Sequence, residues 1–112
     1  MISAYSKINL RVMCDKIVIH ADPDLADLIP GFLENRRKDV LAITEAMARG
    51  DLERVRILGH SMKGSGGGYG FETITEVGGV LEEAARIQDT EAIRHALTRL
   101  EHYLEQVQVV YE

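Results

Sequence analysis

The chain has 112 residues, a formal net charge of −5 and a hydrophobic fraction of 46%, a composition typical of one soluble globular domain. The acidic balance argues against nucleic-acid binding, and no apolar run approaches the roughly 18 residues that cross a bilayer. The single cysteine, Cys14, excludes an internal disulfide and is typical of a reducing compartment. Residues 1–13 lack the pattern of a signal peptide, so we expect a cytoplasmic location.

Residues 1–21 show little periodicity. Residues 16–20, Lys-Ile-Val-Ile-His, have some strand character, but no second strand is evident in the sequence to pair with them. We therefore expect residues 1–21 to form an extended arm that lies on a helical domain of residues 22–112.

A short helix is predicted directly after the arm, from about Pro23 to Ile29. Asp22 can cap its first turn, where proline is well tolerated. The Pro30-Gly31 pair is expected to break or bend this helix, because proline removes a backbone donor and fixes the chain direction.

Two longer helices follow, because apolar residues recur at spacings of three and four. The first covers about Phe32–Met47, and Leu41 is among the residues expected to face inward. Gly50-Asp51 ends this helix and caps the next one. The second helix begins at Leu52 and runs into a cluster of glycines.

Two more helices complete the chain. About Phe71–Ile87 forms the third, and Asp89-Thr90 starts the fourth, in which Val107 is expected to face inward. Short loops of this kind join neighbouring helices of opposite direction. The sequence therefore predicts an all-α fold, an antiparallel four-helix bundle with a short extra N-terminal helix and an extended N-terminal arm.

The glycine cluster is the chemically unusual part of the sequence. Residues 60–71, His-Ser-Met-Lys-Gly-Ser-Gly-Gly-Gly-Tyr-Gly-Phe, contain half of the chain's 10 glycines. Each glycine within a helix costs about 0.5–1 kcal/mol relative to alanine. The cluster therefore indicates either that another backbone packs very closely there or that a partner approaches the surface closely.

Helical projection at ~100° per residue places His60 opposite the apolar stripe and so predicts an exposed imidazole. Lys63 lies one turn further along a flank of the same face, and Ile57 offers an apolar contact one turn earlier. An imidazole nitrogen is a competent nucleophile toward a phosphoryl group, whose charge a neighbouring ammonium can offset.

The run from His60 to Phe71 resembles the signature of histidine-containing phosphotransfer (HPt) domains, and it is similar to the phosphoacceptor domain of chemotaxis histidine kinases. In these families a lysine stands three residues after a histidine, followed directly by glycine, small residues and a glycine before an apolar residue. The resemblance covers about residues 22–109. It implies that His60 accepts a phosphoryl group, that Lys63 supports it, and that Gly64 keeps the docking surface open.

In the chemotaxis relatives, a glutamate on the following helix hydrogen-bonds the phosphoacceptor histidine, and Glu82 falls at the matching position. The resemblance implies that Glu82 fixes the tautomer of His60 and leaves the other ring nitrogen free to attack. The alternative is a solvated glutamate on the helix face. The residues expected to contact a partner are Arg56, Ile57, Gly64 and Gly67.

The leading hypothesis is a phosphoryl carrier that exchanges the group on His60 with the aspartate of a receiver domain. Its expected partners are receiver domains of response regulators, a sensor histidine kinase, or both, and it is expected to act as a monomer. No nucleotide-binding motif is present, so we expect neither kinase activity nor a cofactor, and the receiver partner would supply magnesium.

Two other hypotheses come from different functional classes. The chain could be an interaction module that binds a receiver domain or histidine kinase without carrying phosphate. It could also be a phosphatase for a receiver domain, in which Glu53, on the same helix face as His60, positions a water molecule. The retention of both His60 and Lys63 argues against the interaction module.

Overall fold

The computed structural model describes residues 16–112 of the chain. Four long helices confirm the predicted helical bundle, and two short strands accompany them. In chain order the elements are β1 (Ile17–Ala21), the 3-10 turn η1 (Pro23–Leu25), α2 (Ile29–Arg49), α3 (Leu52–Gly66), the 3-10 turn η2 (Gly67–Tyr69), α4 (Glu72–Arg86), α5 (Thr90–Gln106) and β2 (Val107–Tyr111).

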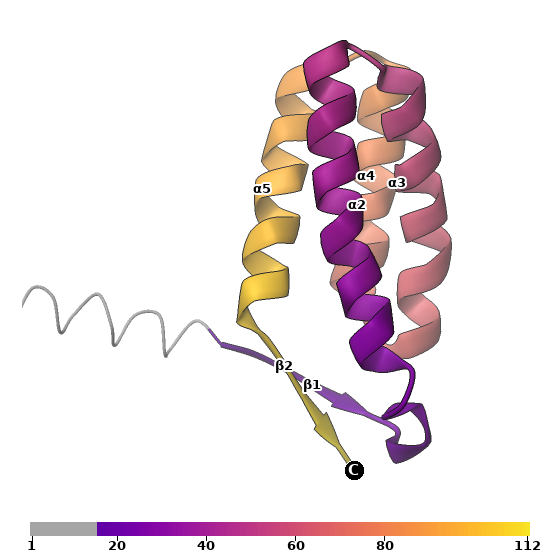
Figure 1. The fold of residues 1–112 in the computed structure, drawn as a ribbon, viewed down its shortest axis with the longest axis vertical. Coiled ribbons are helices and arrows are strands. Elements are labelled where there is room, and N and C mark those ends of the chain that lie inside the picture. The colour runs from indigo at the N-terminus through magenta and orange to yellow at the C-terminus, as the bar shows by residue number, and fades with distance from the viewer. Residues whose placement is uncertain (1–15) are drawn as a thin grey trace, which may run out of the picture.

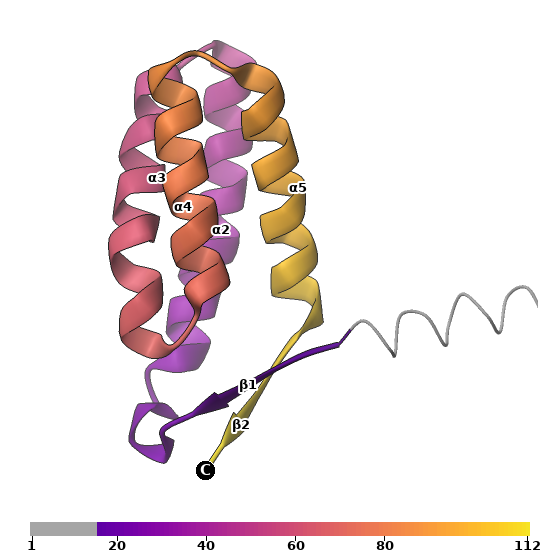
Figure 2. The same cartoon turned by 180° about the vertical axis from the view of Figure 1, so that it is seen from behind.

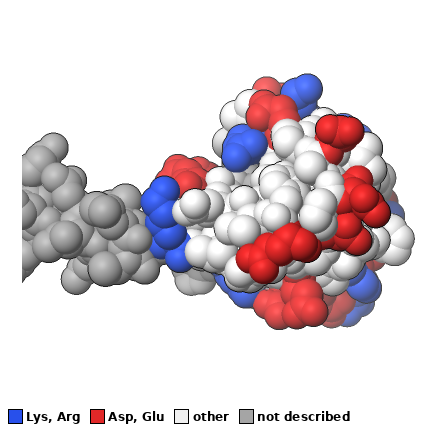
Figure 3. Space-filling model, turned by 90° about the horizontal axis from the view of Figure 1, so that it is seen from below, with Lys and Arg blue, Asp and Glu red and all other residues white. Residues whose placement is uncertain are grey.

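The four helices lie side by side, and their short connections alternate between the two ends of the bundle (Figures 1 and 2). The two strands lie beyond the end of the bundle at which α2 begins and α5 finishes. Seen from that end, the molecule has a largely uncharged surface bordered by acidic and basic side chains (Figure 3). None of the helices within residues 16–112 is both long and apolar enough to span a membrane.

The tight connections between helices follow from their caps. The last turn of α2 ends at Gly50, whose φ of +70° suits glycine, because a side chain there would be strained. The carboxylate of Asp51 then accepts a hydrogen bond from the backbone N–H of Arg54 at 3.0 Å, and Asp89 accepts from Ala92 at 3.1 Å. These caps start α3 and α5 at once, so the chain folds back after very short turns.

The core lies between the four helices and consists of apolar side chains at helical spacing. Its largest fully buried members are Ile29, Ile43, Val55, Met62, Phe71, Ile74, Val77, Leu81, Ile93 and Leu100. The rings of Phe32 and Phe71 stack with their centroids 5.4 Å apart at the end of α3. Leu41 was expected to face inward, but it is 65% exposed on the outer face of α2, because Ile43 and Ala46 fill the core instead.

The strands correct two predictions about the ends of the domain. β1 pairs in parallel with β2, from Ile17 opposite Val107 to Ala21 opposite Tyr111. Ile17–Ala21 are extended as expected, but the expectation that no second strand pairs with them is wrong, and so is the expectation that Val107 continues the last helix. The segment after Gln106 is rich in valine, whose branched side chain favours a strand over a helix. Residues 1–15 of the predicted arm, with Cys14, lie outside the described residues.

The predicted short helix is also corrected. It is a single 3-10 turn, Pro23–Leu25, capped by the carboxylate of Asp22 as expected. Pro30 does not break a helix but lies in the first turn of α2, which begins at Ile29. The reason is that backbone N–H groups of a first turn have no partner within the helix, so proline loses nothing there.

Two leucines that differ in burial, Leu100 and Leu41, give a prediction about stability. Leu100→Ala, at a fully buried position of α5, should lower the free energy of unfolding by about 2–5 kcal/mol. Leu41→Ala, at an exposed position of α2, should change it by less than about 0.5 kcal/mol. Urea denaturation followed by circular dichroism measures both. Equal losses for the two variants would contradict the observed core.

Candidate functional site

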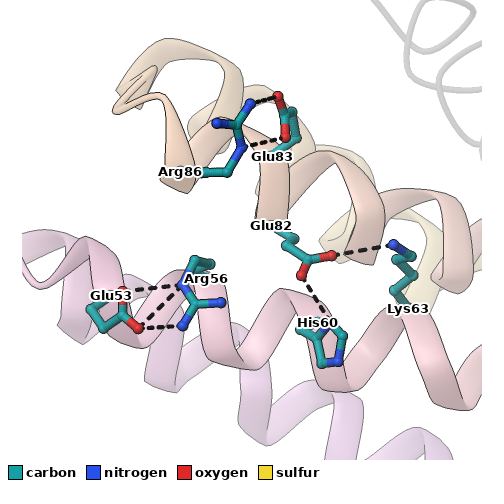
Figure 4. A network of polar contacts seen from close by, with 7 residues as sticks. All are labelled: Glu53, Arg56, His60, Lys63, Glu82, Glu83 and Arg86. Carbon is teal, nitrogen blue, oxygen red and sulfur yellow. Dashed lines mark hydrogen bonds and ion pairs between the residues drawn. The ribbon is translucent and has the colours of Figure 1, made fainter.

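The site is organised around His60, which α3 holds on the surface of the bundle (Figure 4). The buried residues of α3 are Val55, Gly59, Met62 and Gly66, which form the stripe that faces the core. His60 follows Gly59 directly and therefore points away from that stripe. Its side chain is 69% exposed, so a partner molecule can reach the ring.

Glu82 of α4 holds the ring in one orientation. Its Oε2 lies 2.8 Å from His60 Nδ1, and the carboxyl group is only 22% exposed. An ionised carboxylate can only accept hydrogen bonds, so the neutral imidazole carries its hydrogen on Nδ1 and donates it. The second ring nitrogen, Nε2, then has a free lone pair and points away from Glu82 (Figure 4).

Lys63 completes the group from the next turn of α3. Its Nζ donates to Glu82 Oε1 at 3.4 Å, so each oxygen of the carboxylate faces one cationic or hydrogen-bonding partner. The hydrogen bond from His60 is the main cause that lowers the pKa of Glu82 below its ordinary value. Partial desolvation opposes this shift, and the hydrogen bond and charge of Lys63 add to it. Glu82 is therefore ionised at neutral pH.

The remaining acidic groups near His60 are engaged elsewhere. Glu53 accepts hydrogen bonds from the guanidinium of Arg56, which lowers the pKa of Glu53 and occupies both of its carboxylate oxygens. On α4, Glu83 pairs with Arg86 and turns away from His60 (Figure 4). Glu53 is thus poorly placed to activate water, which weakens the phosphatase hypothesis.

The residues expected to contact a partner fall into two groups. Ile57 is 47% exposed one turn before His60, and Gly64 is open, because a Cβ added there would meet no atom within 4 Å. Arg56 lies on the same stretch of α3 but is tied to Glu53. Gly67 lies beyond the end of α3, in η2, where an added Cβ would lie 3.7 Å from Thr75 Oγ1.

The glycine cluster contains both closely packed and open positions. Gly66 packs closely, since a Cβ there would lie 2.6 Å from Thr75 Oγ1 and 2.8 Å from the carbonyl oxygen of Phe71. Gly70 has a φ of +88°, which ends η2 in a conformation that favours glycine. Gly64 and Gly68 have nothing within 4 Å and leave the surface bare.

Sequence analysis missed a contact that supports the site from α2. Arg36 donates through Nη1 to Ser65 Oγ at 2.8 Å, and Ser65 donates in turn to the carbonyl oxygen of Met62 at 3.2 Å. The Arg36 side chain is largely buried over the ring of Phe32. It therefore ties the last, glycine-rich turn of α3 to α2. In sequence the arginine stands in a charged run, Arg-Arg-Lys, that looks like a solvated helix face.

The site itself offers no metal centre of the usual kind. Within residues 16–112, no group of three or more histidine, cysteine, aspartate or glutamate side chains is arranged to hold a metal ion. The groups that meet at this site are a hydrogen-bonded imidazole, a carboxylate and an ammonium group.

The shared carboxylate gives a prediction about pH. A lowered pKa means that the contact of Glu82 with His60 is fully present above the ordinary carboxylate range and is lost as pH falls through the folded value. His60→Ala should raise the pKa of Glu82 toward its ordinary value, and Lys63→Met should raise it less. Carboxyl ¹³C titration measures both, with Glu83 as the internal control. An unchanged Glu82 titration in His60→Ala would contradict this account.

Comparison with known proteins places the chain in a family. A family model described as the Hpt domain matches residues 27–109. A search of curated proteins and a search of solved structures each returned no match. The family match covers most of the chain and all four long helices in full, and it confirms the resemblance to HPt domains. The chain belongs to the Hpt domain family, whose members act in histidine phosphotransfer in two-component signalling.

Proposed function

We propose that this protein is a phosphoryl carrier that accepts a phosphoryl group on His60 Nε2 and exchanges it with the aspartate of a receiver domain. One observation carries the proposal. His60 is highly exposed, while its Nδ1 is held at 2.8 Å from a carboxylate on the neighbouring helix. The hydrogen bond leaves Nε2 unprotonated and directed toward the surface, which is what a nucleophilic ring nitrogen requires.

The transfer step needs no base, because the attacking nitrogen carries no proton. The lone pair of His60 Nε2 attacks the phosphorus of the receiver's aspartyl phosphate, an N–P bond forms, and the P–O bond to the aspartate breaks. The aspartate leaves as a carboxylate and the imidazole ring becomes cationic, because Nδ1 keeps its hydrogen. The negative charge of Glu82 lies against Nδ1 and stabilises that cation. The reverse transfer follows the same path.

Lys63 has a second role in the proposal. Its ammonium group is bound to Glu82 by a long hydrogen bond, 3.4 Å, and about half of its side chain is exposed. It can therefore turn from the carboxylate toward a phosphoryl group on the adjacent ring and offset its charge. Like other Hpt domains, the chain would carry the group rather than act as a typical enzyme.

The partner supplies the remaining parts of the site. Hpt domains interact with receiver domains and histidine kinases in general. We propose that the exposed Ile57 gives an apolar contact to such a partner and that the bare surface at Gly64 lets its backbone approach. No cofactor of this chain enters the step, and the receiver domain would bring the magnesium ion that its aspartyl chemistry uses.

Phosphoryl uptake tests the proposal directly. The protein is mixed with a phosphorylated receiver domain and magnesium, and the label on it should be labile in acid and stable in base. His60→Gln should abolish uptake without changing the thermal unfolding midpoint. His102→Gln, at another exposed histidine, is the matched control and should take up label normally. Binding of several receivers without any label on the wild-type protein would instead identify an interaction module.

The open surface at Gly64 gives a second prediction. A Cβ added at Gly64 would meet no atom of the described residues within 4 Å, so Gly64→Leu should leave the fold unaffected. Uptake from a receiver should nevertheless fall about tenfold or more, because the partner can no longer approach the ring closely. Gly31→Leu, at an equally open position on α2, is the control and should transfer at the normal rate. A normal rate for both variants would exclude Gly64 from the docking surface.

A further inference from the structure

We propose that Gly59 and Gly78 are positioning residues, which bring α3 and α4 close enough together for Glu82 to hold His60. The inference deepens the proposed function and rests on it for the role of His60. The geometry on which it depends is independent of that role. It concerns the backbones that carry the three side chains of the site.

Gly59 packs directly against the backbone of Glu82. A Cβ atom added at Gly59 would lie 2.7 Å from the backbone nitrogen of Glu82 and 2.9 Å from the carbonyl oxygen of Gly78. Both distances are shorter than real Cβ atoms show, and both neighbours are main-chain atoms that cannot turn aside. Any side chain at this position must therefore push α4, and Glu82 with it, away from α3.

Gly78 makes the reciprocal contact on α4. A Cβ atom there would lie 2.8 Å from the carbonyl oxygen of Gly59 and 2.9 Å from the Cα of Lys63, and it would also press on the backbone nitrogen of Lys63. The two glycines thus face each other across the seam between the helices. Each one packs against the main chain of a residue that contributes to the site, Glu82 for Gly59 and Lys63 for Gly78.

The separation of α3 and α4 determines whether His60 and Glu82 can form their hydrogen bond. His60 is the residue after Gly59, and Glu82 lies one turn after Gly78, so both side chains start from the point of closest approach. The bond from Nδ1 to Oε2 is 2.8 Å long, and such bonds are lost beyond roughly 3.5 Å. The other carboxylate oxygen is held by Lys63, which restricts how far Glu82 can adjust.

Another glycine of the same seam provides a matched control. A Cβ at Gly66 would also clash, at 2.8 Å from the backbone nitrogen of Thr75, but it touches neither Glu82 nor the backbone around His60. Gly66→Ala should therefore destabilise the packing of α3 on α4 without displacing Glu82. Gly79→Ala, whose Cβ would make an ordinary 3.7 Å contact with the Lys63 side chain, controls for substitution on α4 itself.

The experiment is imidazole ¹⁵N NMR on the unphosphorylated 112-residue chain. In the wild type, Gly66→Ala and Gly79→Ala, His60 should be held as the Nδ1–H tautomer. In Gly59→Ala and Gly78→Ala the shifts should move to those of a mixture of tautomers, and the pKa of Glu82 should rise toward its ordinary value. All variants are made in a Gly31→Ala background, which replaces a helical glycine at an open position and so favours folding.

Phosphoryl uptake adds a test of whether the glycines act through Glu82. Gly59→Ala should slow uptake by about tenfold or more, as misplaced reacting groups do. In a Glu82→Gln background the same substitution should have no further effect. An undisturbed Nδ1–H tautomer in folded Gly59→Ala and Gly78→Ala would overturn the inference, and so would an equal disturbance in Gly66→Ala. The NMR result stands whatever the uptake assay shows, so failure of this inference and failure of the proposed function are distinguishable.

Discussion

The contact between the main chains of α3 and α4 at Gly59 and Gly78 is the constraint on which the rest of the site depends. Most helix pairs are kept apart by the side chains between them, typically with axes 8–10 Å apart. Here two glycines remove those side chains at one level of the bundle, and each would clash if it carried a Cβ. A carboxylate on one helix can therefore reach an imidazole and an ammonium group on the other.

The single carboxylate of Glu82 contacts both His60 and Lys63. Glu82 orients His60 through Nδ1 and also contacts Lys63, so the proposed nucleophile and the cation proposed to offset phosphoryl charge stay on one face. In the free protein this face is exposed, where water weakens such interactions. A docked partner that excludes water would strengthen them. Such strengthening would let a small bundle with an exposed His60 contribute to the proposed transfer chemistry.

Much of the fold was predictable from local sequence pattern. The apolar spacing within Glu72–Arg86 and Thr90–Gln106 and the aspartate caps at Asp51 and Asp89 identify the helices, because each depends only on residues a few positions apart. The strand pairing was not predictable in the same way, since Ile17 and Val107 stand 90 positions apart in the sequence and neither strand has a partner nearby. Arg36 looked like part of a solvated run for the same reason, as its partner, Ser65, is on another helix.

For the site, the sequence by itself determined which face of α3 carries His60 and Lys63, because helical periodicity separates that face from the buried stripe. It also showed that the glycine cluster lowers helix stability, which indicates close packing or a close approach of a partner at that point. Only the tertiary structure decided that Glu82 meets His60, that Glu53 is occupied by Arg56, and which glycines pack and which are open. These are distances between different turns and helices, and they are set by how closely two backbones approach rather than by any pattern along one of them.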